Sequence, residues 1–129
     1  MKAYKVLKRI DGKLESCQIR VFQGGIHYKK NTLNKPIVKG SLLLCFKELG
    51  DAVNFCTDLC GFGSNTEIWE VNIGKVKKLP AARLYTYNCR SSTIDDLWNK
   101  GTNHIYTPVE QWPQGSIGVT SVRLVKKCK

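Results

Sequence analysis

The fold of this chain is set by residues 41–73, which contain SLLLCF at 41–46, LGDAVNFCTDLC at 49–60 and TEIWEVNI at 66–73. The first segment is a continuous apolar run, as expected of a central strand that is buried on both faces. The second repeats apolar residues every three or four positions and stops at Gly61, which predicts an amphipathic helix. The third places Trp69, Val71 and Ile73 on one side of a predicted strand. The order strand, helix, strand therefore indicates a mixed α and β domain.

The flanking segments add mostly strands. We expect strands over these ranges: 3–9, 17–22, 75–79, 83–87 and 117–127. Asp11-Gly12 predicts a hairpin between the first two, 26–28 is a short extended segment, and 31–39 is a loop. A short second helix is predicted at 93–100, with Ser92 as its cap.

Length and composition fit one folded unit. The 129 residues are 42% hydrophobic and 24% charged, and they are too few for two independent cores. We therefore predict a single compact α+β domain over residues 1–129. It has a predominantly antiparallel sheet of five to seven strands, one main helix and a short second helix.

The charge is strongly positive and unevenly distributed. The net charge is +11, with +9 over residues 1–47, −5 over 48–70 and +7 over 71–129. This balance favours anionic partners, either phosphates or an acidic protein. Apolar runs are too short for a membrane span, and the first residues lack a secretory signal. We expect no membrane partner and a cytoplasmic location, inside a host cell. The oligomeric state does not follow from these features.

The six cysteines are interpreted as reduced thiols. A chain of this length builds a core without disulfides, and most of these cysteines lie in apolar runs. Cys56 and Cys60 are one helical turn apart and, with His27 or His104, form the alternative of a metal site. Their spacing is not that of a structural zinc knuckle. We therefore expect no metal and no cofactor.

One candidate anion site precedes the predicted second helix. Arg90, Ser91 and Ser92 would bring a guanidinium and hydroxyl groups to a helix N-terminus, where backbone N–H groups are free. The alternative is that Ser92 only caps this helix. Trp112, on a loop next to Pro113, is a candidate contact for a ligand or a protein.

A second candidate site combines aromatic and basic residues. Aromatic rings beside cations suit a nucleobase stacked next to its phosphate. The residues predicted to bind there are Arg20, His27, Tyr28, Lys29, Lys30, Arg83, Tyr85 and Tyr87. The alternative is a cross-strand pair of tyrosines, with lysines that protect a sheet edge.

Common enzyme signatures are missing. The segment GFGS at 61–64 lacks the lysine and glycine spacing of a phosphate-binding loop, and neither a zinc-protease motif nor a serine-hydrolase elbow occurs. No catalytic residue is assigned.

Parts of the chain resemble known proteins. The segments concerned are YKVL at 4–7, the loop with Pro36 and Gly40, LLLCF at 42–46, DAVNF at 51–55, EIWEV at 67–71, PVEQWPQGSIGV at 108–119 and VRL at 122–124. Together they look like a group of small uncharacterised proteins of phages and large viruses. The strand, helix, strand order also resembles the core of ADP-ribosyltransferase-like enzymes. Those enzymes bind NAD with a His or Arg on the first strand and an acid near the last, where this chain has Tyr4, Arg9 and Glu110.

Three functions are consistent with these features. We expect a non-enzymatic viral or phage-type protein that binds an anionic ligand, either a nucleotide-like small molecule or the backbone of a nucleic acid, and that counters a host defence. The first alternative is an ADP-ribosyltransferase-like enzyme that uses NAD. The second is a protein-interaction module that inhibits an acidic host protein.

Overall fold

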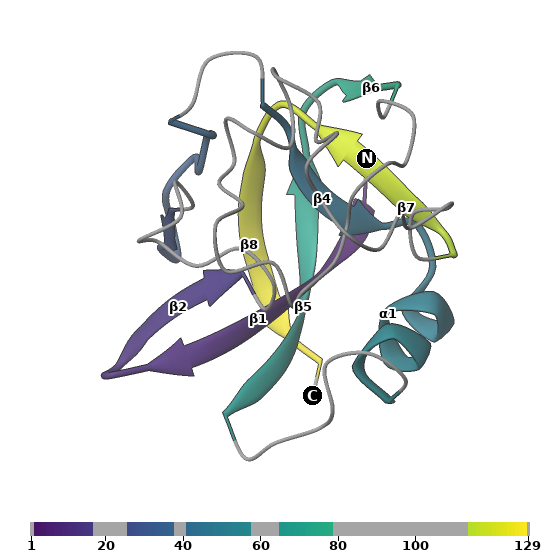
Figure 1. Cartoon of the computed structure of the whole chain (residues 1–129). Coiled ribbons are helices and arrows are strands. Elements are labelled where there is room, and N and C mark those ends of the chain that lie inside the picture. Colours follow the sequence, from purple (N-terminus) through teal and green to yellow (C-terminus); the bar gives the residue numbers. More distant parts are fainter. Residues whose placement is uncertain (1, 17–25, 38–40, 58–64, 79–113, 129) are drawn as a thin grey trace, which may run out of the picture.

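The computed structural model describes residues 2–16, 26–37, 41–57, 65–78 and 114–128. Within these residues the chain forms eight strands and one helix (Figure 1). The strands are β1 (Lys2–Ile10), β2 (Lys13–Ser16), β3 (His27–Tyr28), β4 (Leu43–Phe46), β5 (Thr66–Ile73), β6 (Val76–Lys77), β7 (Ser116–Val119) and β8 (Val122–Lys127), and the helix is α1 (Leu49–Phe55).

Strand β1 organises the sheet. One edge of β1 pairs with β5, while the other pairs with β4 at Tyr4 and with β2 at residues 7–10. Every ladder between the named strands is antiparallel. The β1–β2 turn is made by Asp11 and Gly12, whose φ angles of 52° and 77° are those of a tight hairpin turn. The predicted hairpin at these two residues is confirmed.

The sheet bends strongly where β5 passes into β6 and β7 into β8. At this bend the Gly74 N–H donates to the Ser121 carbonyl, and the Thr120 N–H donates to the Lys75 carbonyl, each at 3.0 Å. A Cβ on Gly74 would clash with the side-chain hydroxyls of Thr120 and Ser121, so any larger residue there would have to displace them. Before the bend β5 pairs with β1 and β8, and beyond it β6 pairs with β7, which pairs with β4 and so leads back to β1. The sheet therefore curls around an interior.

The interior holds the larger apolar cluster. Its buried members are Ala3, Leu7, Leu14, Tyr28, Leu43, Cys45, Trp69, Val71, Val119, Val122 and Leu124. Trp69 and Val71 are buried there and Ile73 packs against them, as the alternation in β5 predicts. Burying these side chains is the main favourable contribution to the fold.

Helix α1 covers the opposite face of β1 and β5. Ala52, Phe55 and Cys56 pack there against Val6 and Ile68. The Phe55 ring also meets the ring of Phe46 on β4, with 5.1 Å between centroids. The two faces of β1 therefore lie in two different cores, which explains why this strand is apolar on both sides.

The predicted α+β class and the order strand, helix, strand are confirmed, but the predicted number of strands is wrong. The described residues alone form eight strands rather than five to seven. One reason is that 117–127 divides into β7 and β8. The inward positions change phase there, from 117 and 119 to 122 and 124, because two residues at the bend interrupt the alternation.

Other differences concern the boundaries. The strand that pairs with β1 in the hairpin is Lys13–Ser16, directly after the turn, so it begins earlier than the predicted strand at 17–22. The predictions at 17–22, 83–87 and 93–100, the second helix included, lie outside the described residues. In the described part of the chain, none of the helical segments has the length and apolar character needed to cross a bilayer.

Candidate functional site

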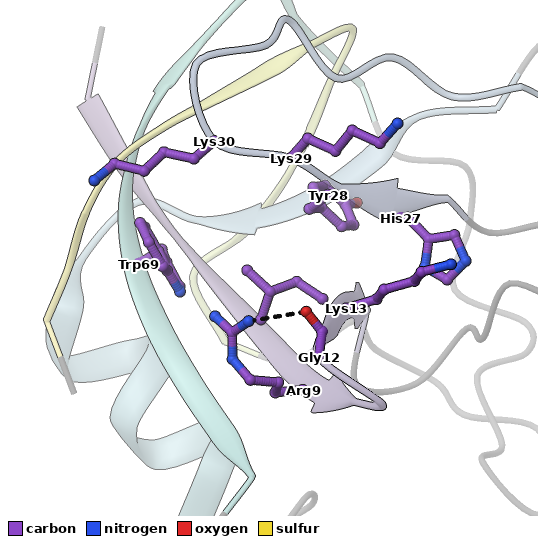
Figure 2. A pocket seen from close by; sticks show the side chains of 9 residues that line it. Arg9, Gly12, Lys13, His27, Tyr28, Lys29, Lys30 and Trp69 are labelled. Atoms are coloured by element: carbon purple, nitrogen blue, oxygen red, sulfur yellow. Dashed lines mark hydrogen bonds between the residues drawn. The ribbon is translucent and has the colours of Figure 1, made fainter.

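A pocket of about 470 Å³ lies at the β1–β2 hairpin (Figure 2). It collects residues from four strands and two connections. They are Arg9 at the end of β1, Gly12 in the turn, Lys13 and Leu14 on β2, His27 and Tyr28 on β3, Lys29 and Lys30 after β3, and Trp69 on β5. This volume is in the usual range for small-molecule sites.

The inner part of the pocket is apolar. Leu14 and Tyr28 are direct partners across the β2–β3 ladder, and both are buried together with Trp69. Burial raises the pKa of Tyr28 well above its usual range, so its phenol is neutral. The buried Lys5 ammonium lies 5.3 Å from the centre of the Tyr28 ring and donates to the Leu44 carbonyl at 2.5 Å. A cation thus lies against the aromatic floor.

The rim of the pocket is basic. Arg9, Lys13, Lys29 and Lys30 are exposed, His27 is half-buried, and none of the described residues that line the pocket is acidic. Figure 2 shows Lys13 running beside His27, Lys30 extending on the side of Trp69, and Lys29 extending the opposite way. The cations therefore surround the apolar floor from several directions, which makes the pocket attractive to anions.

Arg9 is held by contacts on two sides. Its Nε donates to Glu67 Oε2 at 2.6 Å and its Nη2 to Glu67 Oε1 at 3.2 Å, while Nη1 donates to the Gly12 carbonyl at 3.2 Å. The hydrogen bond from Arg9 holds the pKa of Glu67 below its usual range, although burial opposes this effect. Glu67 also accepts the Trp69 Nε1–H at 3.0 Å. One carboxylate therefore orients both the guanidinium and the indole of the pocket.

The loop after β3 is fixed by Asn34, which is only 5% exposed. Its Oδ1 accepts the Lys29 N–H at 2.9 Å, and its Nδ2 contacts the carbonyls of Lys29, Thr32 and Val122 at 3.0–3.1 Å. The main chain of Asn34 pairs with Val122 on β8 as well. These bonds tie the segment that carries Lys29 and Lys30 to a strand far along the chain.

His27 adds a donor at the rim. Its Nδ1 is buried and has no hydrogen-bond partner in the described part of the molecule. A buried N–H without an acceptor is rarer in proteins than an acceptor without a donor. The proton of a neutral His27 is therefore favoured on Nε2.

The structure brings together four of the predicted binding residues, His27, Tyr28, Lys29 and Lys30. The other eight lie outside the described residues: Arg20, Arg83, Tyr85, Tyr87, Arg90, Ser91, Ser92 and Trp112. Glu110 lies outside them as well.

Sequence reasoning missed Arg9, Lys13 and Trp69 as pocket residues. The predicted hairpin at Asp11-Gly12 could have indicated Arg9 and Lys13, because a tight turn brings the ends of its two strands next to each other. For Trp69, alternation indicated the face of β5 but not which residues of other strands share that face.

The structure describes three of the six cysteines, whereas Cys17, Cys60, Cys89 and His104 lie outside the described residues. Cys45, Cys56 and Cys128 are free thiols, in agreement with the reduced interpretation. Burial raises the pKa of Cys45 to about 11. Among the residues placed by the structure, no three His, Cys, Asp or Glu side chains gather as a metal site would require.

Comparison with known proteins returned no matching family model, curated protein or solved structure. The resemblances to phage proteins and to ADP-ribosyltransferase-like enzymes stay predictions.

Proposed function

We propose that this protein binds an anionic ligand in the pocket at the β1–β2 hairpin. The ligand carries phosphate beside an aromatic base, either as a nucleotide-like small molecule or as part of a nucleic acid backbone. The observation that carries the proposal is the composition of the lining, in which four charged basic side chains and a histidine surround an apolar floor with two aromatic residues.

Two physical arguments support this choice of ligand. Four cationic side chains line the pocket, and the Glu67 carboxylate that pairs with Arg9 offsets only one of them, so their field raises the local concentration of anions and speeds their association. The apolar floor offers contact to an uncharged ring, which inorganic phosphate alone would not use. A molecule with both parts fits the pocket better than either part alone.

The test is a thermal unfolding series on nuclease-treated protein. Its panel comprises NAD, ADP-ribose, cyclic di- and trinucleotides, and single- and double-stranded oligonucleotides. A ligand at about 100 times its Kd adds roughly 2.7 kcal/mol to the native state, which raises the Tm by several degrees. A small nucleotide and a nucleic acid are then separated by salt, because only a multi-phosphate partner has a steep linear dependence of log K on log salt.

Two double variants, each with one pair of substitutions and the same change in net charge, show where the ligand binds. Lys13→Ala with Lys30→Ala removes two cations from the rim, whereas Lys77→Ala with Lys126→Ala removes two exposed cations elsewhere. We expect the first pair to abolish most of the ligand-induced shift and the second pair to retain it. A panel that produces no shift, or two pairs that weaken binding equally, would overturn the proposed site.

A further inference from the structure

Arg9 has N–H donors that no described residue accepts, and its side chain lines the candidate pocket. A guanidinium has five N–H donors. Three are engaged, one each on Nε, Nη1 and Nη2, with Glu67 and Gly12 as the acceptors. Within the described segments, one hydrogen on each terminal nitrogen has no acceptor. The side chain of Arg9 is 42% exposed and lines the pocket, so a ligand can reach these two donors.

The position of these donors is set before any ligand binds. Glu67 engages the Nε and Nη2 edge from β5, and the Gly12 carbonyl engages Nη1 from the turn, as the dashed line in Figure 2 indicates. A side chain held in this way loses little rotational freedom when it binds an anion, because that entropy is already lost in the folded protein. Paired N–H donors on terminal guanidinium nitrogens match two oxygens of a phosphate group.

The charge of the lining distinguishes between two kinds of phosphate. Arg9, Lys13, Lys29 and Lys30 are positive, and the Glu67 carboxylate, which pairs with Arg9, offsets one of these charges. A phosphodiester in a nucleic acid backbone carries a single negative charge. A terminal phosphate carries about −1.5 to −2 and has three acceptor oxygens. The remaining positive charge therefore matches the terminal phosphate better.

We propose that Arg9 binds the terminal phosphate of a phosphomonoester, such as a nucleoside 5′-monophosphate, and that Glu67 is its positioning residue. The inference rests on the proposed function and narrows it to one class of ligand. The terminal phosphate lies against the two remaining Arg9 donors, and the base lies toward Trp69 and Tyr28. Lys13 and Lys30 supply additional charge from opposite sides.

The experiment compares ligands that have a terminal phosphate with ligands that lack one. Isothermal titration measures the binding of the four ribonucleoside 5′-monophosphates, adenosine, and ApA, a dinucleotide with one phosphodiester and no terminal phosphate. We expect at least one monophosphate to bind about tenfold or more tightly than ApA, because its terminal phosphate carries more negative charge and one more acceptor oxygen than a phosphodiester. Equal binding of ApA and the monophosphates would overturn the inference.

A conservative substitution tests Arg9 itself. Arg9→Lys retains the positive charge but loses the paired donors, so the affinity for the monophosphate should decrease about tenfold while that for adenosine is unchanged. Arg123→Lys, at an exposed position on β8 outside the pocket, is the matched control and should retain the affinity. A general loss of structure would change adenosine binding too. Unchanged monophosphate binding by Arg9→Lys would refute the assignment.

A second measurement uses the unmodified protein, in case Arg9→Lys does not fold. In ¹⁵N-labelled protein, the Arg9 side-chain resonances should shift on addition of the monophosphate and not on addition of adenosine. Shifts of equal size with both ligands contradict the inference. Binding of oligonucleotides without any binding of monophosphates would support the proposed function and overturn this inference. Binding of neither class would overturn the proposed function itself.

Discussion

Replacement of Asn34 by alanine tests how the wall of the pocket is held in place. The side chain of Asn34 joins the segment after β3 to β8 through contacts with Lys29, Thr32 and Val122. Alanine removes these contacts and leaves the main-chain pairing with Val122, at 2.8 and 2.9 Å, intact. The variant therefore isolates the contribution of the side-chain amide.

The magnitude follows from the individual bonds. Nδ2 has two hydrogens for three carbonyls, so together with the acceptor Oδ1 the amide makes the equivalent of three hydrogen bonds. A net contribution of roughly 1 kcal/mol for each bond gives a total of about 3 kcal/mol. Lys29 and Thr32 are exposed, so water replaces part of the loss. The Val122 carbonyl retains its main-chain donor. We expect a loss of about 2 kcal/mol.

Urea denaturation measures this loss. With an m value of roughly 1–3 kcal/mol/M, the midpoint should decrease by about 1 M without a change in slope. Asn72→Ala, at an exposed position on β5, is the matched control and should stay within about 0.5 kcal/mol of the unmodified protein. A loss below about 0.5 kcal/mol for Asn34→Ala, or an equal loss for both variants, would refute the reasoning.

Asn34→Asp extends the test to pH. The carboxylate retains the acceptor for the Lys29 N–H but places negative charge against the carbonyls that Nδ2 contacts. Burial and these oxygens raise the folded-state pKa of the introduced carboxyl. Its destabilisation should therefore be smallest at low pH and increase as the pH rises through that pKa. A destabilisation independent of pH contradicts this account of the Asn34 contacts.

Three further predictions concern other parts of the chain. Gly115→Ala should lower the free energy of unfolding, measured by urea denaturation, by about 2 kcal/mol or more, because the φ of Gly115 is +79° and the new Cβ would clash with the Asp51 side chain. An unchanged free energy of unfolding would show that neither constraint matters. Arg9 lowers the pKa of Glu67 in the folded state. The Arg9–Glu67 pair therefore stabilises the protein at pH values above the unfolded-state pKa of Glu67, about 4.3, and this stabilisation is lost as the pH falls below it. The difference in urea midpoint between the unmodified protein and Glu67→Gln should shrink from about pH 6 to about pH 3, and a constant difference speaks against the pair. Burial raises the pKa of Cys45 to about 11, so iodoacetamide at about pH 8 should modify this thiol only after the protein unfolds. Mass spectrometry detects the modification, and rapid modification of the native protein would contradict the burial of Cys45.

The backbone elements were more predictable than the pocket. Strand β5 begins at Thr66 and ends at Ile73 as predicted, because alternation in an eight-residue segment is a clear local signal. The single predicted strand at 117–127 was wrong because the change of phase at Thr120–Ser121 depends on the bend opposite Gly74. The cluster at 27–30 could be proposed because its residues are consecutive, whereas its partners in the pocket are not.

Local patterns were sufficient for the strand, helix, strand order, the hairpin at Asp11-Gly12 and the positive charge, because each depends on residues close together in the chain. The pocket depends instead on strand pairing. The β1–β5 register places Arg9 near Glu67 and Trp69, and the β2–β3 register places Tyr28 beside Leu14. Alternation along a strand specifies which face a side chain occupies, but not which strand lies next to it. Only the tertiary structure decided those neighbours, and with them the candidate site.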